Sequence, residues 1–308
     1  MTDWDRVKRL LGQDTMDHLA RQTVAVVGLG SGGGYVAVAL AMTGVRKFVL
    51  VDDDILDAHN VVRHIADQRD VGRPKVAVVG DLIRHRNPEA EIQQIHGRIE
   101  DHFAVLDTVD MVVVGVDSEG SKFSLNEACL ERHLTAVYAG VYERGEGGDV
   151  VTIYPYKGPC YACWASALRE GNVSPSPDDA DEDLDYGQLR ADGTLAAEPG
   201  LWLDVVRVAN TQASVTLNSL LAGTPARRDL PANTVILASQ PLEILEGHLT
   251  PPFSAEWVDI ARNPSCLVCG TLQTRQSEAD ISLDALLNET GEADTSQSVH
   301  KSGKQNHD

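Results

Sequence analysis

The chain has 308 residues, of which 43% are hydrophobic, so it is long enough for one large α/β domain or two small ones. Its formal net charge of −20 argues against binding to nucleic acid or a membrane surface, because both depend on Lys and Arg. No apolar run approaches the roughly 20 residues that a membrane-spanning helix needs.

The N-terminus lacks the basic and apolar regions of a signal peptide, so we expect a soluble, cytoplasmic protein. Within residues 1–21, apolar side chains recur at near-helical spacing, and Gly12 divides them into two short helices. Arg6 lies in the first of these helices, and its spacing alone indicates a solvated charge.

A glycine-rich turn follows the first predicted strand. Residues 22–28 form a β-branched run typical of a parallel strand covered on both faces. Gly28, Gly30 and Gly33 then form G-x-G-x-x-G ahead of a predicted helix over residues 35–42. The first glycine permits a tight turn, the second lets a phosphate approach the backbone, and the third lets helix and strand pack closely. The motif predicts a nucleotide phosphate at the helix N-terminus.

Two further predicted strands end in acidic residues. Residues 47–51 lead into Asp52, where a carboxylate can bind the ribose hydroxyls of a nucleotide. Residues 110–116 lead into Asp117, at the edge of the sheet where an aspartate can hold Mg²⁺ against phosphates. The alternative for Asp117 is the N-cap of the following helix, a position that Asp and Ser both favour.

Between these strands lie more polar groups than a simple dinucleotide site needs. Asn60 and Arg63 are spaced to share one face of a helical turn. Lys75 follows Pro74 at the predicted start of a helix over residues 76–83. The helix dipole disfavours a cation there unless an anion is present, which indicates a bound polyphosphate. A flexible surface lysine is the alternative.

The rest of the pattern predicts one α/β fold. Further strands are expected at residues 91–96, 134–139, 149–154, 235–238 and 242–245, and helices at residues 124–133 and 201–221. The strand at 149–154 follows a glycine-rich turn, so we expect it to be antiparallel. Four residues of the last helix are predicted to face the core: Leu203, Val206, Leu217 and Leu220.

Two C-x-x-C pairs, Cys160 with Cys163 and Cys266 with Cys269, each follow a proline. In a reducing compartment, two such pairs are typical of a four-thiolate zinc site rather than of disulfides. The site would join distant segments, and it would leave no position for a substrate, so its role would be structural. A redox-active C-x-x-C pair is the alternative.

Taken in order, these motifs make the chain similar to the ThiF/MoeB-like adenylyltransferases, relatives of the ubiquitin-activating enzymes. The resemblance covers roughly residues 5–165 and 198–270. It rests on the glycine loop, D-x-D at Asp52 and Asp54, N-x-x-R at Asn60 and Arg63, G-x-P-K ending at Lys75, Asp117, and both cysteine pairs. It implies a doubly wound, mostly parallel, Rossmann-like sheet with an antiparallel extension.

The resemblance also implies roles for individual residues. Asp52 would hold the ribose of ATP, while Asn60, Arg63 and Lys75 would grip its phosphates. Asp117 would position Mg²⁺.

Arg6 matches an N-terminal arginine that dimers of this family insert into the ATP site of the neighbouring subunit. The resemblance therefore implies a homodimer with a catalytic Arg6. The expected partner is a small β-grasp protein, either ubiquitin-like or a sulfur carrier. Its C-terminal carboxylate would attack the α-phosphorus of ATP to give an acyl-adenylate and pyrophosphate.

Two alternatives remain for the reaction. The same chemistry could act on a peptide or another small carboxylate. An NAD-dependent oxidoreductase would explain the glycines and Asp52, but not Arg63, Lys75 or the cysteine pairs.

The chain departs from the family pattern at three places. His64 stands where the family usually has Gln, and Ser31 replaces a glycine. Once four cysteines are assigned to zinc, only Cys129 remains, in a predicted helix where a free cysteine is usually buried. We therefore expect no thioester nucleophile.

The expected organisation has five parts. They are an N-terminal helical segment at 1–21, an ATP-binding α/β core at 22–171, an acidic flexible loop at 172–200, the C-terminal part of the same domain at 201–270, and a mostly disordered tail at 271–308. The second cysteine pair belongs to the fourth part.

Overall fold

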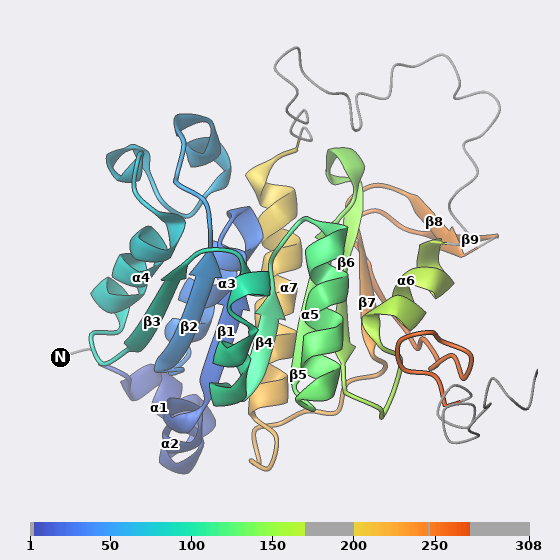
Figure 1. Cartoon of the computed structure of the whole chain (residues 1–308), viewed down its shortest axis with the longest axis horizontal. Coiled ribbons are helices and arrows are strands. Elements are labelled where there is room, and N and C mark those ends of the chain that lie inside the picture. Colours follow the sequence, from blue (N-terminus) through green and yellow to red (C-terminus); the bar gives the residue numbers. More distant parts are fainter. Residues whose placement is uncertain (1–2, 170–199, 246, 272–308) are drawn as a thin grey trace, which may run out of the picture.

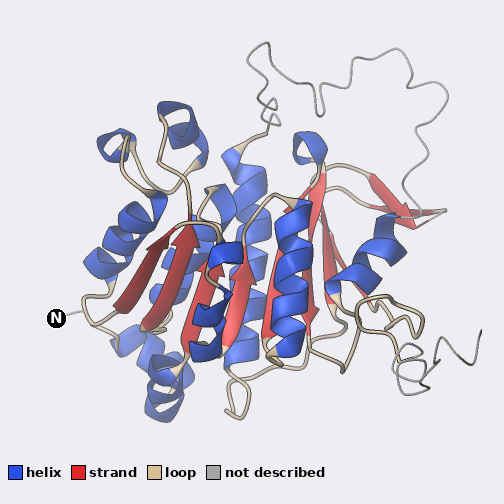
Figure 2. Ribbon diagram, in the orientation of Figure 1, coloured by secondary structure: helices blue, strands red, loops and turns tan. Residues whose placement is uncertain are grey.

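The computed structural model describes residues 3–169, 200–245 and 247–271 (Figure 1). Almost all of the expected acidic loop and of the expected tail lies outside the described residues. Within them, the chain forms an eight-stranded sheet with helices on both faces and a separate two-stranded hairpin (Figures 1 and 2). None of the described helices combines the length and the apolar character needed to cross a lipid bilayer.

The sheet has a parallel half and an antiparallel half, in the order β10-β7-β6-β5-β4-β1-β2-β3. The parallel strands are β1 (Thr23–Val27), β2 (Lys47–Asp52), β3 (Glu91–His96), β4 (Met111–Val114) and β5 (Thr135–Val141). The antiparallel strands are β6 (Gly147–Ile153), β7 (Thr234–Ala238) and β10 (Ala255–Val258). The hairpin consists of β8 (Leu242–Leu245) and β9 (His248–Thr250). The predicted mostly parallel sheet with an antiparallel extension is confirmed.

Helices cover both faces of this sheet. They are α1 (Asp5–Leu11), α2 (Gln13–Arg21), α3 (Ser31–Ala41), α4 (Lys75–Arg86), α5 (Glu119–Glu131), α6 (Tyr161–Arg169) and α7 (Trp202–Leu220). Short 3-10 helices are η1 (Ala58–Arg63), η2 (Gln68–Asp70), η3 (Ile99–Asp101), η4 (Phe103–Thr108) and η5 (Glu143–Gly145). The predicted division of the N-terminal segment at Gly12 is confirmed.

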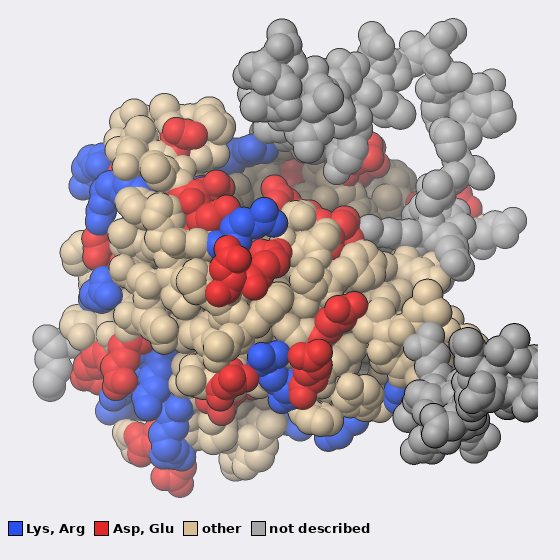
Figure 3. Space-filling model, in the orientation of Figure 1, with Lys and Arg blue, Asp and Glu red and all other residues tan. Residues whose placement is uncertain are grey.

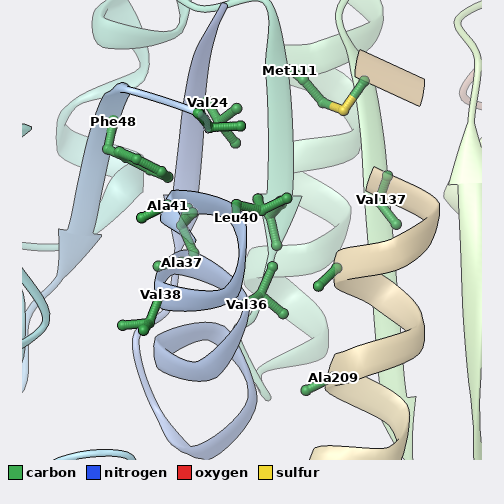
Figure 4. Packing of buried hydrophobic residues seen from close by; sticks show 14 of the residues in the cluster. Val24, Val36, Ala37, Val38, Leu40, Ala41, Phe48, Met111, Val137 and Ala209 are labelled. Carbon is green, nitrogen blue, oxygen red and sulfur yellow. The ribbon is translucent and has the colours of Figure 1, made fainter. Parts of the chain in front are cut away.

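The alternation of side chains along each strand separates two hydrophobic layers. Val24 and Val26 of β1 face the layer formed with α3, α4 and α7, whereas Ala25 and Val27 face the layer formed with α5 and α6. Figure 4 shows Ala37 and its neighbours on α3 packed beside α7 on one face of the sheet. Burial on both faces explains the uninterrupted apolar runs of the parallel strands.

The structure differs from the sequence expectation in places where long-range packing decides. Helix α3 begins at Ser31 instead of residue 35, so the end of the glycine loop already belongs to the helix. Leu203, predicted to be in the core, is 75% exposed because it lies on the solvent-facing side of α7, in helical register with the exposed Asn210 and Ser214. Val206 is half-buried. Leu220 is buried as predicted, Leu217 packs against the core, and the core face of α7 also includes Val208 and Ala213. Strands β9 and β10 were not predicted.

Candidate nucleotide and metal sites

A cavity of about 510 Å³ lies where the carboxyl ends of β1, β2 and β4 meet the N-terminus of α3. This edge of the parallel half is where doubly wound sheets bind ligands. The cavity brings together most of the predicted nucleotide-binding residues: Gly28, Gly30, Asp52, Asp54, Asn60, Arg63, Lys75 and Asp117. Gly33 and Arg6 are not among its lining residues.

The three glycines of the loop have different constraints. Gly28 has φ +85°, and a Cβ there would lie 2.5 Å from the carbonyl carbon of Gly115. A Cβ on Gly33 would lie 1.9 Å from the carbonyl oxygen of Gly28, so helix and strand could not pack. A Cβ on Gly30 would meet nothing within 4 Å, and Gly30 lines the cavity as the N-cap of α3. Gly30 is therefore where a phosphate can approach the helix N-terminus.

Asp52 joins the end of β2 to the glycine loop. Its Oδ2 accepts a hydrogen bond of 2.5 Å from the backbone N–H of Leu29, and its Oδ1 accepts one of 2.8 Å from Asp54. Burial raises the pKa of Asp52, while the N–H of Leu29 and the charge of Lys75 oppose this shift. The carboxylate is thus fixed at the cavity wall before any ligand binds.

Lys75 is not the flexible surface residue of the alternative interpretation, because only 8% of it is exposed. It is the first residue of α4, after Pro74 as the N-cap. Its Nζ lies 2.6 Å from Oδ2 of Asp54, and its backbone N–H donates to the carbonyl of Asp54. The Asp54 carboxylate therefore offsets the unfavourable interaction of a cation with the helix N-terminus.

Asn60 and Arg63 lie together on η1, the helical turn that their spacing predicted, and both line the cavity. Asn60 also stabilises this turn, because its Oδ1 accepts a hydrogen bond of 3.0 Å from the backbone N–H of Asp57. The carboxylate of Asp57 completes a capping box with the backbone of Asn60.

His64 supports the glycine loop from inside the protein and is only 6% exposed. Its Nδ1 accepts a hydrogen bond from the backbone N–H of Ala66, so its Nε2 carries the proton and donates to the carbonyl of Leu29 at 2.8 Å. Burial lowers the pKa of His64. This neutral histidine takes the place of the glutamine that is usual in the family.

Asp117 is exposed and is not the N-cap of α5, so the capping role that was the alternative for this residue is excluded. The N-cap is Ser118, whose side chain accepts from the backbone N–H of Ser121. The hydroxyl of Ser121 donates to Glu100 at 2.6 Å, and both residues line the nucleotide cavity. Sequence reasoning missed Ser121 and Glu100, although each follows the carboxyl end of a parallel strand.

A second cavity, of about 890 Å³, adjoins the first at Asp117, which lines both. Its walls come from β4, β5 and β6 and from α6 and α7, with apolar side chains such as Trp164 and Val208. Among the described residues that line it, five are acidic: Asp117, Glu119, Glu143, Glu146 and Asp149. Lys122 is the basic residue of this lining. Figure 3 shows acidic residues, with some basic ones, along the upper part of the face where the parallel strands end.

The four predicted zinc ligands come together although the two pairs are far apart in the chain. The Sγ of Cys160 lies 3.7 Å from those of Cys163 and Cys266, and the Sγ atoms of Cys163 and Cys269 are 3.5 Å apart. A tetrahedral zinc ion with Zn–S bonds of about 2.3 Å separates its ligands by about 3.8 Å. All four residues are buried, so the cluster has the chemistry and dimensions of a closed structural metal site. The zinc ion itself remains a prediction.

The fifth cysteine has a different environment. Cys129 lies inside α5, is 2% exposed, and belongs to the hydrophobic layer beneath α5 and α6. Its burial raises the pKa of the thiol to about 12. A thiol of this kind is protonated and shielded, and so is poorly suited to nucleophilic attack.

Arg6 is exposed on α1, at the edge of the sheet opposite the upper strand ends (Figure 1). It lies outside the cavity lining of its own chain. If Arg6 acts at a nucleotide site, that site must be on another subunit, so this role stays a prediction.

The fold and the cavity together define a doubly wound α/β protein with a candidate nucleotide cavity and a separate four-cysteine site. More particularly, the chain belongs to the ThiF family, whose profile matches residues 5–273.

The chain is also similar to named proteins. The chain is 29% identical over 182 residues to the SAMP-activating enzyme E1 of Haloferax volcanii, covering 56% of the chain and 66% of that protein. It is 30% identical over 171 residues to ubiquitin-like modifier-activating enzyme 5 of Caenorhabditis briggsae, covering 51% of the chain and 39% of the relative. It is 27% identical over 167 residues to the probable molybdopterin-synthase adenylyltransferase of Porphyra purpurea, covering 53% and 42%. The chain thus spans only part of the length of these relatives.

Solved structures show the same fold. The crystal structure of E. coli MccB aligns with a TM-score of 0.61 at 19% identity, covering 83% of the chain and 67% of MccB. A structure of MccB with ATP aligns with a TM-score of 0.58 at the same identity, covering 83% of the chain and 69% of that protein. At this identity, the likeness supports the fold alone.

Proposed function

We propose that the chain is an ATP-dependent adenylyltransferase that activates the C-terminal carboxylate of a small β-grasp protein, either ubiquitin-like or a sulfur carrier. The observation that carries this proposal is the meeting of Arg63, Lys75 and Asp117 with the glycine loop in one cavity. The names of the relatives agree with it, since they include activating enzymes and an adenylyltransferase.

In this proposal, the residues of the nucleotide cavity bind and neutralise the substrate. Backbone N–H groups at the start of α3 and the side chains of Asn60, Arg63 and Lys75 bind the phosphates, and Asp52 binds the ribose. Asp117 holds Mg²⁺, which would withdraw charge from the phosphate oxygens when bound. The ammonium group of Lys75 contacts the Asp54 carboxylate in the structure. When ATP binds, this ammonium group either contacts both Asp54 and a phosphate or leaves Asp54 for the phosphate.

The reaction needs no general base, because a C-terminal carboxylate is already ionised at neutral pH. One carboxylate oxygen forms a bond to the α-phosphorus, and the bond from that phosphorus to the bridging oxygen breaks. The electron pair leaves with pyrophosphate, so the products are an acyl-adenylate and pyrophosphate. The protein contributes mainly position and charge stabilisation.

We assign the second cavity to the C-terminal tail that carries the substrate carboxylate. It adjoins the nucleotide cavity at Asp117, and its volume of about 890 Å³ accommodates an extended tail of a few residues. The buried state of Cys129 indicates that the adenylate passes to a nucleophile outside this chain. A thiol, a sulfide or an amine would each serve as that acceptor.

A peptide or another small carboxylate is the second candidate substrate. One MccB structure is described as a complex with N-formylated MccA, and it aligns with the chain at a TM-score of 0.60, 19% identity and coverage of 83% of the chain and 70% of MccB. The second cavity provides the space that both substrate classes require. The NAD-dependent oxidoreductase would leave the positions of Arg63 and Lys75 unexplained.

Exchange of labelled pyrophosphate into ATP tests the activity. We expect exchange that depends on Mg²⁺ and on a carrier protein ending in glycine, and no change in nicotinamide absorbance. A gene beside this one that encodes a small protein ending in Gly-Gly would supply the first carrier to try. Exchange supported equally by carriers that lack the terminal carboxylate would refute the proposal.

We also propose a homodimer in which Arg6 reaches the nucleotide site of the partner subunit. The exposed position of Arg6 on α1 and its distance from the edge that carries its own cavity support action between subunits. Mixing Arg6→Ala with Asp117→Ala protein should restore activity, because each heterodimer then holds one intact site. Absence of rescue in a verified heterodimer would remove Arg6 from the mechanism.

For the cysteine cluster we propose structural zinc. Metal analysis of the purified protein should find one zinc per chain, and Cys266→Ser should lose it and unfold at a lower temperature. Unchanged metal content in this variant would reject the four-thiolate assignment.

A further inference from the structure

The two cysteine pairs differ at the residue that follows their first cysteine. Tyr161 follows Cys160 and is only 2% exposed, whereas Leu267 follows Cys266 and is 81% exposed. One pair is therefore packed into the protein through this residue, and the other presents it to solvent. This asymmetry raises the question of what Tyr161 contacts.

Tyr161 is joined to α5 by its backbone, its hydroxyl and its ring. Its backbone N–H donates a hydrogen bond of 2.8 Å to Oδ1 of Asn126. Its phenol hydroxyl lies 3.1 and 3.3 Å from the two carboxylate oxygens of Glu119. Its ring packs edge-on against Phe123 with centroids 5.3 Å apart and stacks on Tyr138 of β5 at 4.6 Å. Three of these four partners belong to α5.

The acceptor of the phenol hydroxyl lies in the first turn of α5, beside the proposed magnesium ligand. Glu119 also binds Nζ of Lys122 at 2.9 Å, and the side chain of Lys122 is 9% exposed. Asp117 is two residues before Glu119 and is separated from it only by the N-cap, Ser118. The position of Glu119 therefore constrains the backbone that presents Asp117 to both cavities.

We propose that Tyr161 is a positioning residue that couples the four-cysteine site to Asp117. Metal held by the cysteines would fix Cys160, the adjacent Tyr161 would fix Glu119, and Glu119 would hold Asp117 in place for Mg²⁺. The inference rests on the proposed function, because Asp117 is there assigned to Mg²⁺. Its consequence is that metal in the cysteine site sets how much Mg²⁺ the protein needs to bind ATP.

The test compares Tyr161→Phe with Leu267→Ala, the matched variant at the equivalent position of the other pair. Phenylalanine keeps the packed ring and removes only the hydroxyl. We expect Tyr161→Phe to raise the Mg²⁺ concentration for half-maximal ATP binding roughly tenfold, the loss expected for one hydrogen bond to a charged acceptor. Zinc content and melting temperature should stay at wild-type values. Leu267→Ala should leave all three measurements unchanged.

Two further variants keep the test decisive. Glu119→Gln preserves the volume of the acceptor, and we expect it to shift the Mg²⁺ requirement in the same direction. Cys266→Ser, which should lose zinc, is expected to shift it as well. The double variant Tyr161→Phe/Cys266→Ser should then differ from Cys266→Ser less than threefold in its Mg²⁺ requirement. Two changes that break the same chain of contacts are not additive.

The outcomes separate this inference from the proposed function. If wild-type protein binds ATP with Mg²⁺ and Asp117→Ala does not, but Tyr161→Phe has the wild-type Mg²⁺ requirement, only the inference is overturned. Full additivity of Tyr161→Phe and Cys266→Ser would also overturn it. If wild-type protein shows no Mg²⁺-dependent binding of ATP, both the inference and the proposed function fail.

Discussion

The two cavities that meet at Asp117 are built in different ways. The nucleotide cavity, on the parallel half of the sheet, consists of backbone N–H groups and side chains that already have partners, such as Asp52 on Leu29 and Lys75 on Asp54. The second cavity is larger, about 890 against 510 Å³, and mixes apolar side chains of α6 and α7 with acidic residues.

Under the proposed function, this difference suits the two cavities to different substrates. A preorganised cluster of charges suits a ligand of constant chemistry, such as ATP, because little has to move when it binds. An apolar cavity with an acidic lining suits a protein tail, whose side chains can be selected by size and charge. Variants on each side of Asp117 should therefore have separable effects.

The largest expected effect comes from Asp117 and Arg63. Replacing either with Ala should reduce pyrophosphate exchange more than about a hundredfold, because each removes charge stabilisation from the transition state. Melting temperatures should stay near wild type, since Asp117 is exposed and neither residue is in a hydrophobic cluster. Arg84→Ala, on the exposed side of α4, is the matched control for charge and should keep full activity.

Gly30 and Gly33 should separate ligand binding from folding. Gly33→Ala places a Cβ 1.9 Å from the carbonyl oxygen of Gly28, so it should destabilise the protein by about 1–3 kcal/mol through overpacking. Gly30→Ala meets open space within the chain, so stability should hold while ATP affinity falls at least about tenfold, since the methyl group faces the phosphates. Urea denaturation and calorimetry with ATP measure the two effects. Equal losses of affinity without destabilisation in both variants would contradict this assignment.

A smaller effect is expected at the second cavity. Its acidic lining favours a carrier tail with Lys or Arg before the terminal glycine, so Glu146→Lys should raise the KM for such a tail about three- to tenfold. The affinity for ATP should stay the same, and the effect should shrink as salt increases. Glu127→Lys, on an exposed position of α5 outside both cavity linings, is the control. An unchanged KM would exclude the acidic lining from tail selection.

The smallest effect concerns pH. Because burial lowers the pKa of His64, the unfolded chain takes up a proton below about pH 6.5 that the folded chain does not. The contribution of His64 to the free energy of unfolding is therefore present above that pH and is lost as the pH falls. His64→Gln should lose less stability than wild type between about pH 7 and pH 5. Parallel urea titrations at the two pH values measure the difference, and identical losses would show that His64 does not titrate as expected.

Several features of the site were predictable because they depend on short stretches of chain. The glycine motif, the acids after β2 and β4, and the turn that carries Asn60 and Arg63 are each local, so their spacing alone defines them. The meeting of the two cysteine pairs was also predictable, because two C-x-x-C sequences in one chain are typical of a four-thiolate metal site.

Other features depended on contacts between distant segments. The sequence does not show that Tyr161 is buried while Leu267 is exposed, or that Lys75 is buried against Asp54. It also does not decide between Asp117 and Ser118 as the N-cap of α5. Leu203 is apolar yet lies on the solvent-facing side of α7 with Asn210 and Ser214, because contacts with the rest of the fold decide which face of this helix is buried.

The sequence by itself determined the class of fold and most of the side chains that line the candidate nucleotide cavity, since the strands, turns and polar residues there follow one another along the chain. Only the tertiary structure decided which side chains are buried, how the second cavity is lined, and how the first cysteine pair is connected to α5. The physical reason is that burial and charge pairing are set by neighbours in space, and those neighbours come from segments far apart in the chain.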